Sequence, residues 1–181
     1  FLVTEVMKRM NENLNIYDPS ARKNFSNDKG RVAIAALGGA RLTREERVTT
    51  ALNWGNETSR EAVLEDQSKI SDYGQAWNET AINEILSTLD TQDLDFIEAT
   101  WTLIDSFWED YTLPNGRVVQ GIKSLETETA GFSPPKVEPD PFFINGRMMS
   151  GGYYPLMYDP LSDERSAKES EAELKKRLES G

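Results

Sequence analysis

The sequence contains no cysteine and no histidine among its 181 residues. Without thiolates or imidazoles, disulfide bonds, thiolate chemistry and histidine-based catalytic triads are excluded, and a zinc site is not expected. Any catalysis would depend on carboxylate, lysine, tyrosine, serine or threonine side chains. We therefore expect no metal and no cofactor in this protein.

Long apolar runs and basic residues are also scarce. Hydrophobic residues make up 38% of the chain and the mean hydropathy is −0.59, and no run approaches the ~20 apolar residues that span a bilayer. The 20 lysines and arginines face 31 acids, for a net charge of −11. Nucleic acid is not favoured as a partner, because phosphate binding needs clustered cations. A small basic cluster consists of Arg22, Lys23, Lys29 and Arg31. We expect these cations to balance the chain's own acids.

Residues 91–111 hold two of the four tryptophans and two of the seven phenylalanines. The large apolar residues of this stretch follow a three–four spacing, which places them on one side of a helix: Leu94, Ile97, Trp101, Ile104, Trp108 and Tyr111. We predict a central aromatic helix here, with Thr91 as its N-cap. The opposite side should face water or a partner through four acids: Asp95, Glu98, Asp105 and Glu109.

Amphipathic spacing and capping signals predict helices elsewhere in the chain. The sequence Thr43-Arg44-Glu45-Glu46 has the form of a capping box. Helices are expected at residues 1–16, 43–52, 59–65, 76–89 and 118–125. For the apolar run 32–37 we favour a buried helix, although a strand stays open. Residues 19–30 and 66–75 are predicted to be loops.

The C-terminal third has a different character. Prolines predict an extended path at 131–141, and Asn145-Gly146 between apolar triplets is a strong hairpin signal. Residues 162–180 are nearly all charged or small, as in a solvated helix. The predicted fold is thus mainly α, a multi-helix domain with a small β-hairpin near 142–158 and a charged C-terminal helix. We expect a single domain at 1–160 and a helical tail or linker at 161–181.

Two stretches resemble a known protein family when taken together. ALNWGNETSREAVL (51–64) and GGYYPLMYDPLSDERS (151–166), with the W-x-x-I-D-S-F-W of 101–108 between them, resemble a helical segment of the very large polyvalent proteins of tailed phages. The resemblance covers about residues 40–165. It implies a non-catalytic structural or interaction module, carried in the virion and delivered to the bacterial host's cytoplasm or envelope. The implied partners are other modules of the same large protein or other virion proteins.

The resemblance assigns no catalytic residue to the chain. It also implies a parent far longer than 181 residues. The N-terminus lacks the layout of a signal peptide. Because the chain begins with phenylalanine, we expect a processed product or an excised module. The oligomeric state is left open.

The polar cluster from Asn53 to Glu57 allows two interpretations. In the functional one, its amides and carboxylate bind a ligand or partner, with Trp54 as a platform. In the structural one, which we favour, Gly55 ends a helix in the left-handed conformation, Trp54 packs on the core and the amides, Asn56 included, bind free backbone groups.

The run Gly151-Gly152-Tyr153-Tyr154-Pro155 also has a structural interpretation and functional ones. A phosphate-cradling loop is disfavoured, because the lysine and hydroxyl of that motif are missing. We favour a tight backbone crossing with the tyrosines covering the core. Alternatively, the tyrosines anchor a neighbouring module. The candidate partner-binding residues are Trp54, Asn56, Tyr153, Tyr154 and Tyr158.

Two further functions stay open. A muramidase-like glycoside hydrolase would use carboxylates in a cleft, and Asp105 and Glu109 lie one turn apart. We favour a solvated acidic face for this pair; were Asp105 buried, it should bind a backbone group, Arg41 or Arg47. The other alternative is an acidic DNA mimic that inhibits a host nuclease, which requires acids spaced like phosphates along one face.

Overall fold

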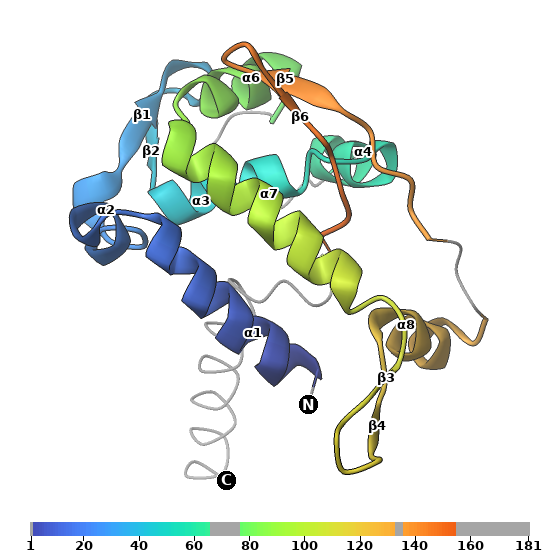
Figure 1. The fold of residues 1–181 in the computed structure, drawn as a ribbon. Coiled ribbons are helices and arrows are strands. Elements are labelled where there is room, and N and C mark those ends of the chain that lie inside the picture. The colour runs from blue at the N-terminus through green and yellow to red at the C-terminus, as the bar shows by residue number, and fades with distance from the viewer. Residues whose placement is uncertain (1, 66–76, 133–135, 155–181) are drawn as a thin grey trace, which may run out of the picture.

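The computed structural model describes residues 2–65, 77–132 and 136–154. Helices predominate in this part, and the strands form three separate antiparallel hairpins (Figure 1). The mainly helical class predicted from the sequence is confirmed. The helices are α1 (Leu2–Asn13), α2 (Pro19–Lys23), α3 (Arg44–Leu52), α4 (Glu57–Glu65), α6 (Glu79–Ser87), α7 (Thr91–Ser106) and α8 (Ile122–Ala130). The hairpins are β1 (Val32–Ile34) with β2 (Ala40–Leu42), β3 (Tyr111–Thr112) with β4 (Val118–Val119), and β5 (Phe142–Ile144) with β6 (Arg147–Met149).

Helix α7 packs against both α1 and α3 (Figure 1). Its N-cap is Asp90, one residue before the predicted Thr91, and Asp93 completes a capping box. The helix ends at Ser106, so the prediction of a helix over 91–111 is wrong for residues 107–111. The cause lies downstream, because the carbonyl of Phe107 accepts the N–H of Ile122 at the start of α8, at 2.9 Å. The aromatic sequence continues, but its backbone is used to begin another helix.

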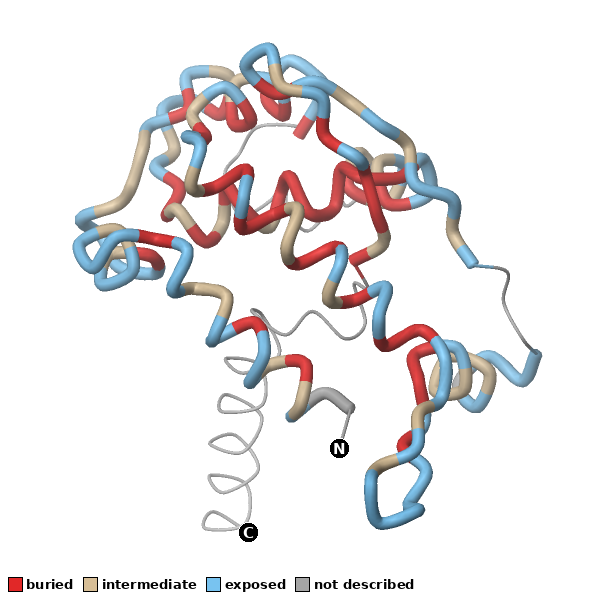
Figure 2. The backbone as a smooth tube through the Cα atoms, in the orientation of Figure 1, coloured by how far each residue is buried: buried red, intermediate tan, exposed pale blue. Residues whose placement is uncertain are grey.

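The core extends from α7 to the N-terminal segments. Buried residues follow α7, α3 and α6 and continue into the segment before α4 (Figure 2). The rings of Tyr17, Phe25 and Phe96 meet with centroids 5.4–5.8 Å apart. They join α7 to the loops around α2. Large aromatic surfaces therefore hold segments that are distant in sequence.

Residues 19–30 are not entirely a loop, as the sequence had suggested. They include α2, where the side chain of Asp18 accepts the N–H of Ala21 and Pro19 occupies the first turn. Asp18 caps α2 with its side chain, and Pro19 suits the first position of the helix because its φ is fixed near the helical value. The same two residues end the preceding segment.

The favoured helix at 32–37 is wrong, and the strand alternative is correct for its first half. Residues 32–34 form β1, paired with β2, and Ala35–Leu37 form a short 3-10 turn. Gly38 and Gly39 reverse the chain at φ 69° and 84°. The carboxylate of Glu84 accepts the N–H groups of Ala35 and Ala36, which satisfies backbone donors that a helix would have used.

The hairpin predicted from Asn145-Gly146 is present at 142–149. Both turn residues have positive φ, 49° and 83°, as a type I′ turn requires. The predicted extended continuation beyond residue 154 and the predicted charged tail at 161–181 lie outside the described residues. The division into a domain and a tail therefore stays a prediction. Predicted helix 118–125 is in part wrong, because 118–119 form β4 and α8 begins only at Ile122. No helix in the described ranges is long and apolar enough to cross a membrane.

Candidate interaction site

The segment 136–154, here called the strap, runs from beside α4 through the β5–β6 hairpin and returns along α7 (Figure 1). Two acids of α7 hold it. Asp95 forms an ion pair with Arg147 at 2.8 Å, and the carboxylate of Glu98 accepts the N–H of Ser150 at 2.8 Å. The side of α7 predicted to face water or a partner is therefore used in part to bind the chain's own C-terminal segment.

A pair of glycines lies where the strap crosses the segment after α3. The carbonyl of Gly55 accepts the N–H groups of Gly152 and Asp140, each at 2.9 Å. A Cβ on Gly55 would lie 2.7 Å from the nitrogen of Gly152, and one on Gly152 would lie 2.5 Å from Cγ of Trp101. Gly55 does not adopt the predicted left-handed conformation. The close backbone of Gly152 and the Trp101 ring explain Gly55, and the Trp101 side chain explains Gly152, so the chain crosses tightly here, as proposed for 151–152.

The candidate residues Trp54 and Asn56 belong to this crossing. Asn56 is fully buried, donates to the carbonyl of Gly152 at 3.0 Å and accepts the N–H of Ser59 at 2.8 Å. Trp54 is 8% exposed, and the guanidinium of Arg60 lies 5.6 Å from its ring centroid. Both side chains are thus engaged within the chain.

The tyrosines after the crossing differ in exposure. Tyr154 is fully buried. Tyr153 is half-buried, meets Trp108 edge to face at 6.2 Å and donates its hydroxyl to Glu126. Tyr158 lies outside the described residues. Partner binding by the five candidates stays a prediction, although Asn56 and Tyr154 have no surface in this conformation with which to contact another chain.

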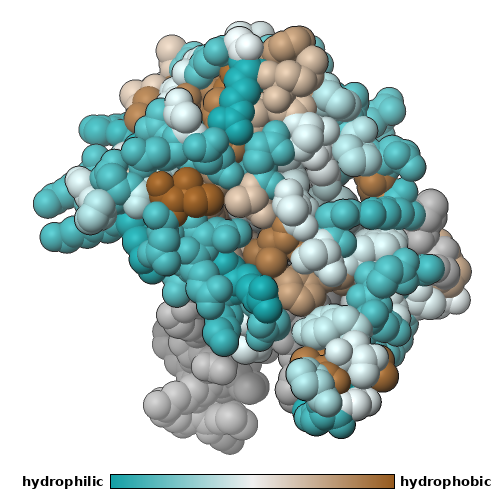
Figure 3. All heavy atoms as spheres, in the orientation of Figure 1, coloured by the Kyte–Doolittle hydropathy of each residue, from teal (hydrophilic) through white to brown (hydrophobic). Residues whose placement is uncertain are grey.

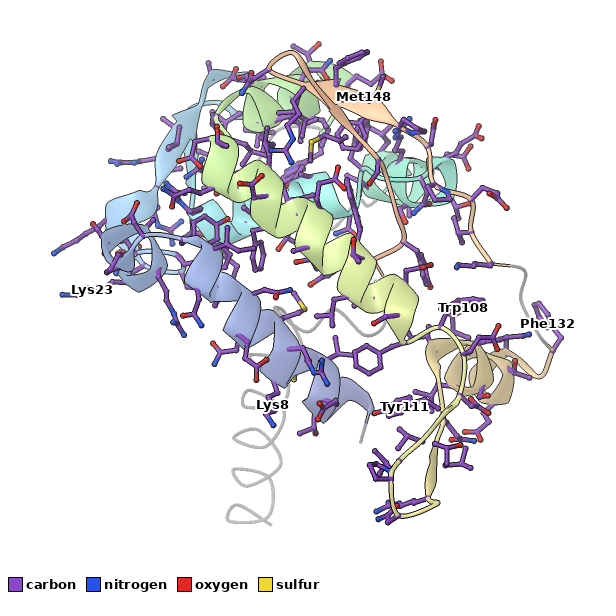
Figure 4. All side chains as sticks on the ribbon, viewed as in Figure 1. Lys8, Lys23, Trp108, Tyr111, Phe132 and Met148 are labelled. Atoms are coloured by element: carbon purple, nitrogen blue, oxygen red, sulfur yellow. The ribbon has the colours of Figure 1, made fainter. Side chains whose placement is uncertain are left out.

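A cleft of about 470 Å³ lies between the second half of α7 and the strap. Its apolar lining includes Trp101, Trp108 and Tyr153. Asp105 and Glu138 are the acids of its lining, and both are exposed. Asp105 forms an ion pair with Lys136 rather than with the arginines considered for a buried carboxylate. Figure 4 shows Trp108 at the C-terminal end of α7, near the strap.

The most buried carboxylate lies elsewhere. Asp93 is 1% exposed, accepts the hydroxyl of Tyr17 at 2.7 Å and the N–H of Asp90 at 2.9 Å, and pairs with Arg44 at 3.1 Å. Burial raises the pKa of Asp93 despite these partners. Burial of the Tyr17 hydroxyl raises its pKa, and the nearby carboxylate of Asp93 raises it further. Asp93 is therefore part of the core and does not line the cleft described above.

The outward face of the β5–β6 hairpin was not among the candidates. Phe143 and Met148 lie opposite each other in the strand register and are 65% and 54% exposed. Met148 lies at the edge of the molecule in Figure 4, and Figure 3 shows apolar side chains at the same end. Strand alternation could have identified this pair, because period two places Phe142 and Ile144 on the other side.

No group of three or more acidic, histidine or cysteine side chains among the described residues could hold a metal ion. In the basic cluster, Arg31 pairs with Asp28 at 2.6 Å and with Glu46 at 3.4 Å.

Comparison of the chain with protein-family models, curated proteins and solved structures found no match.

Proposed function

We propose that this chain is a non-catalytic interaction module that binds a partner protein through the Phe143–Met148 face of its hairpin. The observation that carries the proposal is the exposure of two large apolar side chains, 65% and 54%, side by side on one short hairpin. Aromatic residues and methionine are enriched at the centres of protein interfaces. Burying each such side chain contributes about 1.5–3 kcal/mol.

The rigidity of the hairpin supports this role. The Asn145 amide donates to the carbonyls of Ser87 and Leu89, at 3.2 and 3.0 Å. Ile144 and Met149 are buried on the inner side, with 2% and 0% exposure. The exposed pair is therefore held in place before a partner arrives, which lowers the entropy lost on binding.

The carboxylates do not favour the muramidase alternative. A glycosidase needs a proton-holding acid at the substrate cleft. In the described cleft both acids, Asp105 and Glu138, are exposed. The acid with a raised pKa, Asp93, is bound within the core.

The distribution of acids does not favour a DNA mimic either. Several surface carboxylates are paired with the chain's own cations: Asp95 with Arg147, Asp105 with Lys136, Asp140 with Arg60 and Glu109 with Lys123. A phosphate mimic requires free negative charges along one face. The first three pairs instead tie α7 and α4 to the strap, and the fourth ties the segment after α7 to α8.

We further propose the biological setting that the sequence resemblance implies. The chain would be one module of a large polyvalent protein of a tailed phage, carried in the virion and delivered to the host. Its partners would be other modules of that protein or other virion proteins. The support for this setting is the resemblance of residues 51–64 and 151–166 alone.

The proposal can be tested in phage particles by site-specific photo-crosslinking. A photoreactive amino acid replaces Phe143 in the encoded protein, and purified virions are irradiated and analysed by mass spectrometry. We expect crosslinks to another virion protein or to a distant part of the same polypeptide. The control position is Lys8, which is exposed on α1, at the other end of the molecule from the hairpin (Figure 4).

Two results would overturn different parts of the proposal. Equal crosslinking from positions 143 and 8 would refute the Phe143–Met148 face as the docking surface. Absence of the chain's peptides from purified particles would refute the virion setting. Met148→Ser should leave the fold intact, because its side chain is exposed, and should weaken the crosslinked product formed from the probe at position 143.

A further inference from the structure

We propose that the cleft between α7 and the strap binds the ammonium side chain of a lysine presented by a peptide. This site is separate from the hairpin face and goes beyond the proposed docking function. The cleft volume of about 470 Å³ falls in the range of about 300–1,000 Å³ found for ligand pockets. A side chain with an apolar stem and a charged end fits such a space.

The wall of the cleft suits the stem and the cation together. Pro139 and the half-buried ring of Tyr153 supply apolar and aromatic surface, while Trp101 and Trp108 also line the cleft but are only 3% and 7% exposed. The face of an indole or phenol ring attracts an ammonium group within about 6 Å of its centroid. Methylene groups of a lysine pack well on the same rings.

The charge around the cleft favours a cation. Its lining contains two acids, Asp105 and Glu138, and one base, Lys136. Among the lining residues the acids therefore outnumber the bases by two to one, and the Lys136–Asp105 pair leaves the charge of Glu138 uncompensated within the lining.

The unequal positions of the two lining acids indicate where the ligand binds. Asp105 is already paired with Lys136. Glu138 has no ion pair or hydrogen bond with any described residue, so its charge is available to a ligand. The Lys136–Asp105 pair shows that this rim accommodates an ammonium group. An incoming lysine would meet Glu138 and would be repelled by Lys136.

A neutral sugar is the competing occupant, because saccharides also pack against aromatic rings. Its hydroxyl groups would donate hydrogen bonds to the acids at the rim, but a neutral molecule gains no ionic attraction from them. The surplus of carboxylates is the observation that favours a cation over a sugar. The two occupants are separated by how binding responds to charge.

Calorimetric titration of the chain with three probes tests the proposal. The probes are a short peptide with a central lysine, the same peptide with norleucine in its place, and triacetylchitotriose. We expect the lysine peptide to bind at least about fivefold more tightly than the norleucine peptide, the ratio for a weakly screened cation–π contact and ion pair together. Glu138→Gln removes only the ion pair and should weaken lysine binding by a smaller factor, about twofold, and Lys136→Gln should strengthen it.

Glu61→Gln is the matched control, because it removes the same charge from an exposed position on α4 that does not line the cleft. It should leave the affinity unchanged. Both test positions are exposed, so the variants should fold, and the amide NMR spectrum verifies this. The lysine peptide should shift the amide resonances of Gly151 and Gly152 more than those of α1.

Three results would overturn the cation site. These are equal affinity for the lysine and norleucine peptides, tighter binding of triacetylchitotriose than of the lysine peptide, and equal effects of Glu138→Gln and Glu61→Gln. None of these results bears on crosslinking from the hairpin. The two proposals therefore fail independently.

Discussion

Asp93→Asn should destabilise the fold, and the loss should grow as the pH falls. Asp93 accepts two hydrogen bonds, from Tyr17 and the Asp90 N–H, and pairs with Arg44. An amide of the same size can still accept from Tyr17. It places an NH₂ group against the Asp90 N–H and removes the charge opposite Arg44. Losing the cap and the partly buried pair should cost about 3 kcal/mol at about pH 7.

The pH dependence follows from the raised pKa of Asp93. Burial makes the native state hold a proton on this carboxyl more tightly than the unfolded state does. Asp93 therefore contributes stability that is fully present below the unfolded pKa and is lost as the pH rises through the native pKa. The variant amide does not titrate. The difference in unfolding free energy between the two proteins should thus be larger at about pH 4.5 than at about pH 7.

Urea unfolding followed by tryptophan fluorescence measures this difference at both pH values. Other carboxylates also titrate, and the pKa of Asp18 and that of Asp110 are lowered by their hydrogen bonds. They are common to both proteins and cancel in the difference. Tyr17→Phe is the control, since it removes one hydrogen bond at a cost of about 1 kcal/mol and leaves the carboxyl in place. A difference that shrinks toward acid would refute the reasoning, as would a loss below about 1 kcal/mol at neutral pH.

Three other outcomes are expected. Gly152→Ala should destabilise the chain by about 3 kcal/mol or more in the same urea assay, because the new Cβ would lie 2.5 Å from Trp101. Gly116→Ala, at φ 83° with nothing within 4 Å, should cost only about 1 kcal/mol, so equal losses would contradict the crossing. Asn145→Ala should speed amide hydrogen exchange in β5 and β6 more than Asn145→Gly, which keeps the positive φ and loses only the bonds to the end of α6. The isolated chain should release no reducing sugar from peptidoglycan; measurable turnover would restore the muramidase alternative.

Local signals in the sequence predicted local structure well. The capping box at Thr43–Glu46 and the turn at Asn145-Gly146 are both present. In each case a few neighbouring residues satisfy their own backbone groups or supply the required φ. Such features need no information from the rest of the chain.

The failures come from contacts between distant segments. Residues 32–37 did not form a helix because β2 pairs with 32–34 and Glu84 accepts the N–H groups of Ala35 and Ala36, and neither partner is visible in the run itself. Gly55 was expected to end a helix by adopting a left-handed conformation. Its actual requirement is space for Gly152, 97 positions later in the chain. A glycine's local pattern does not reveal which backbone will approach it.

The acidic side of α7 shows why the candidate site was only partly predictable. Amphipathic spacing separates a core-facing stripe from a polar face, but it does not distinguish a polar face in water from one that binds another polar segment. Asp95 and Glu98 bind the strap, and the strap forms one wall of the cleft. The cleft thus depends on the Gly55–Gly152 crossing and on these two acids together. A variant that releases either connection should lose the proposed lysine site and the packing of the strap's own core side chains, Ile144, Met149 and Tyr154. It should keep the contacts of α7 with α1 and α3 and of α3 with α6, because these do not involve the strap.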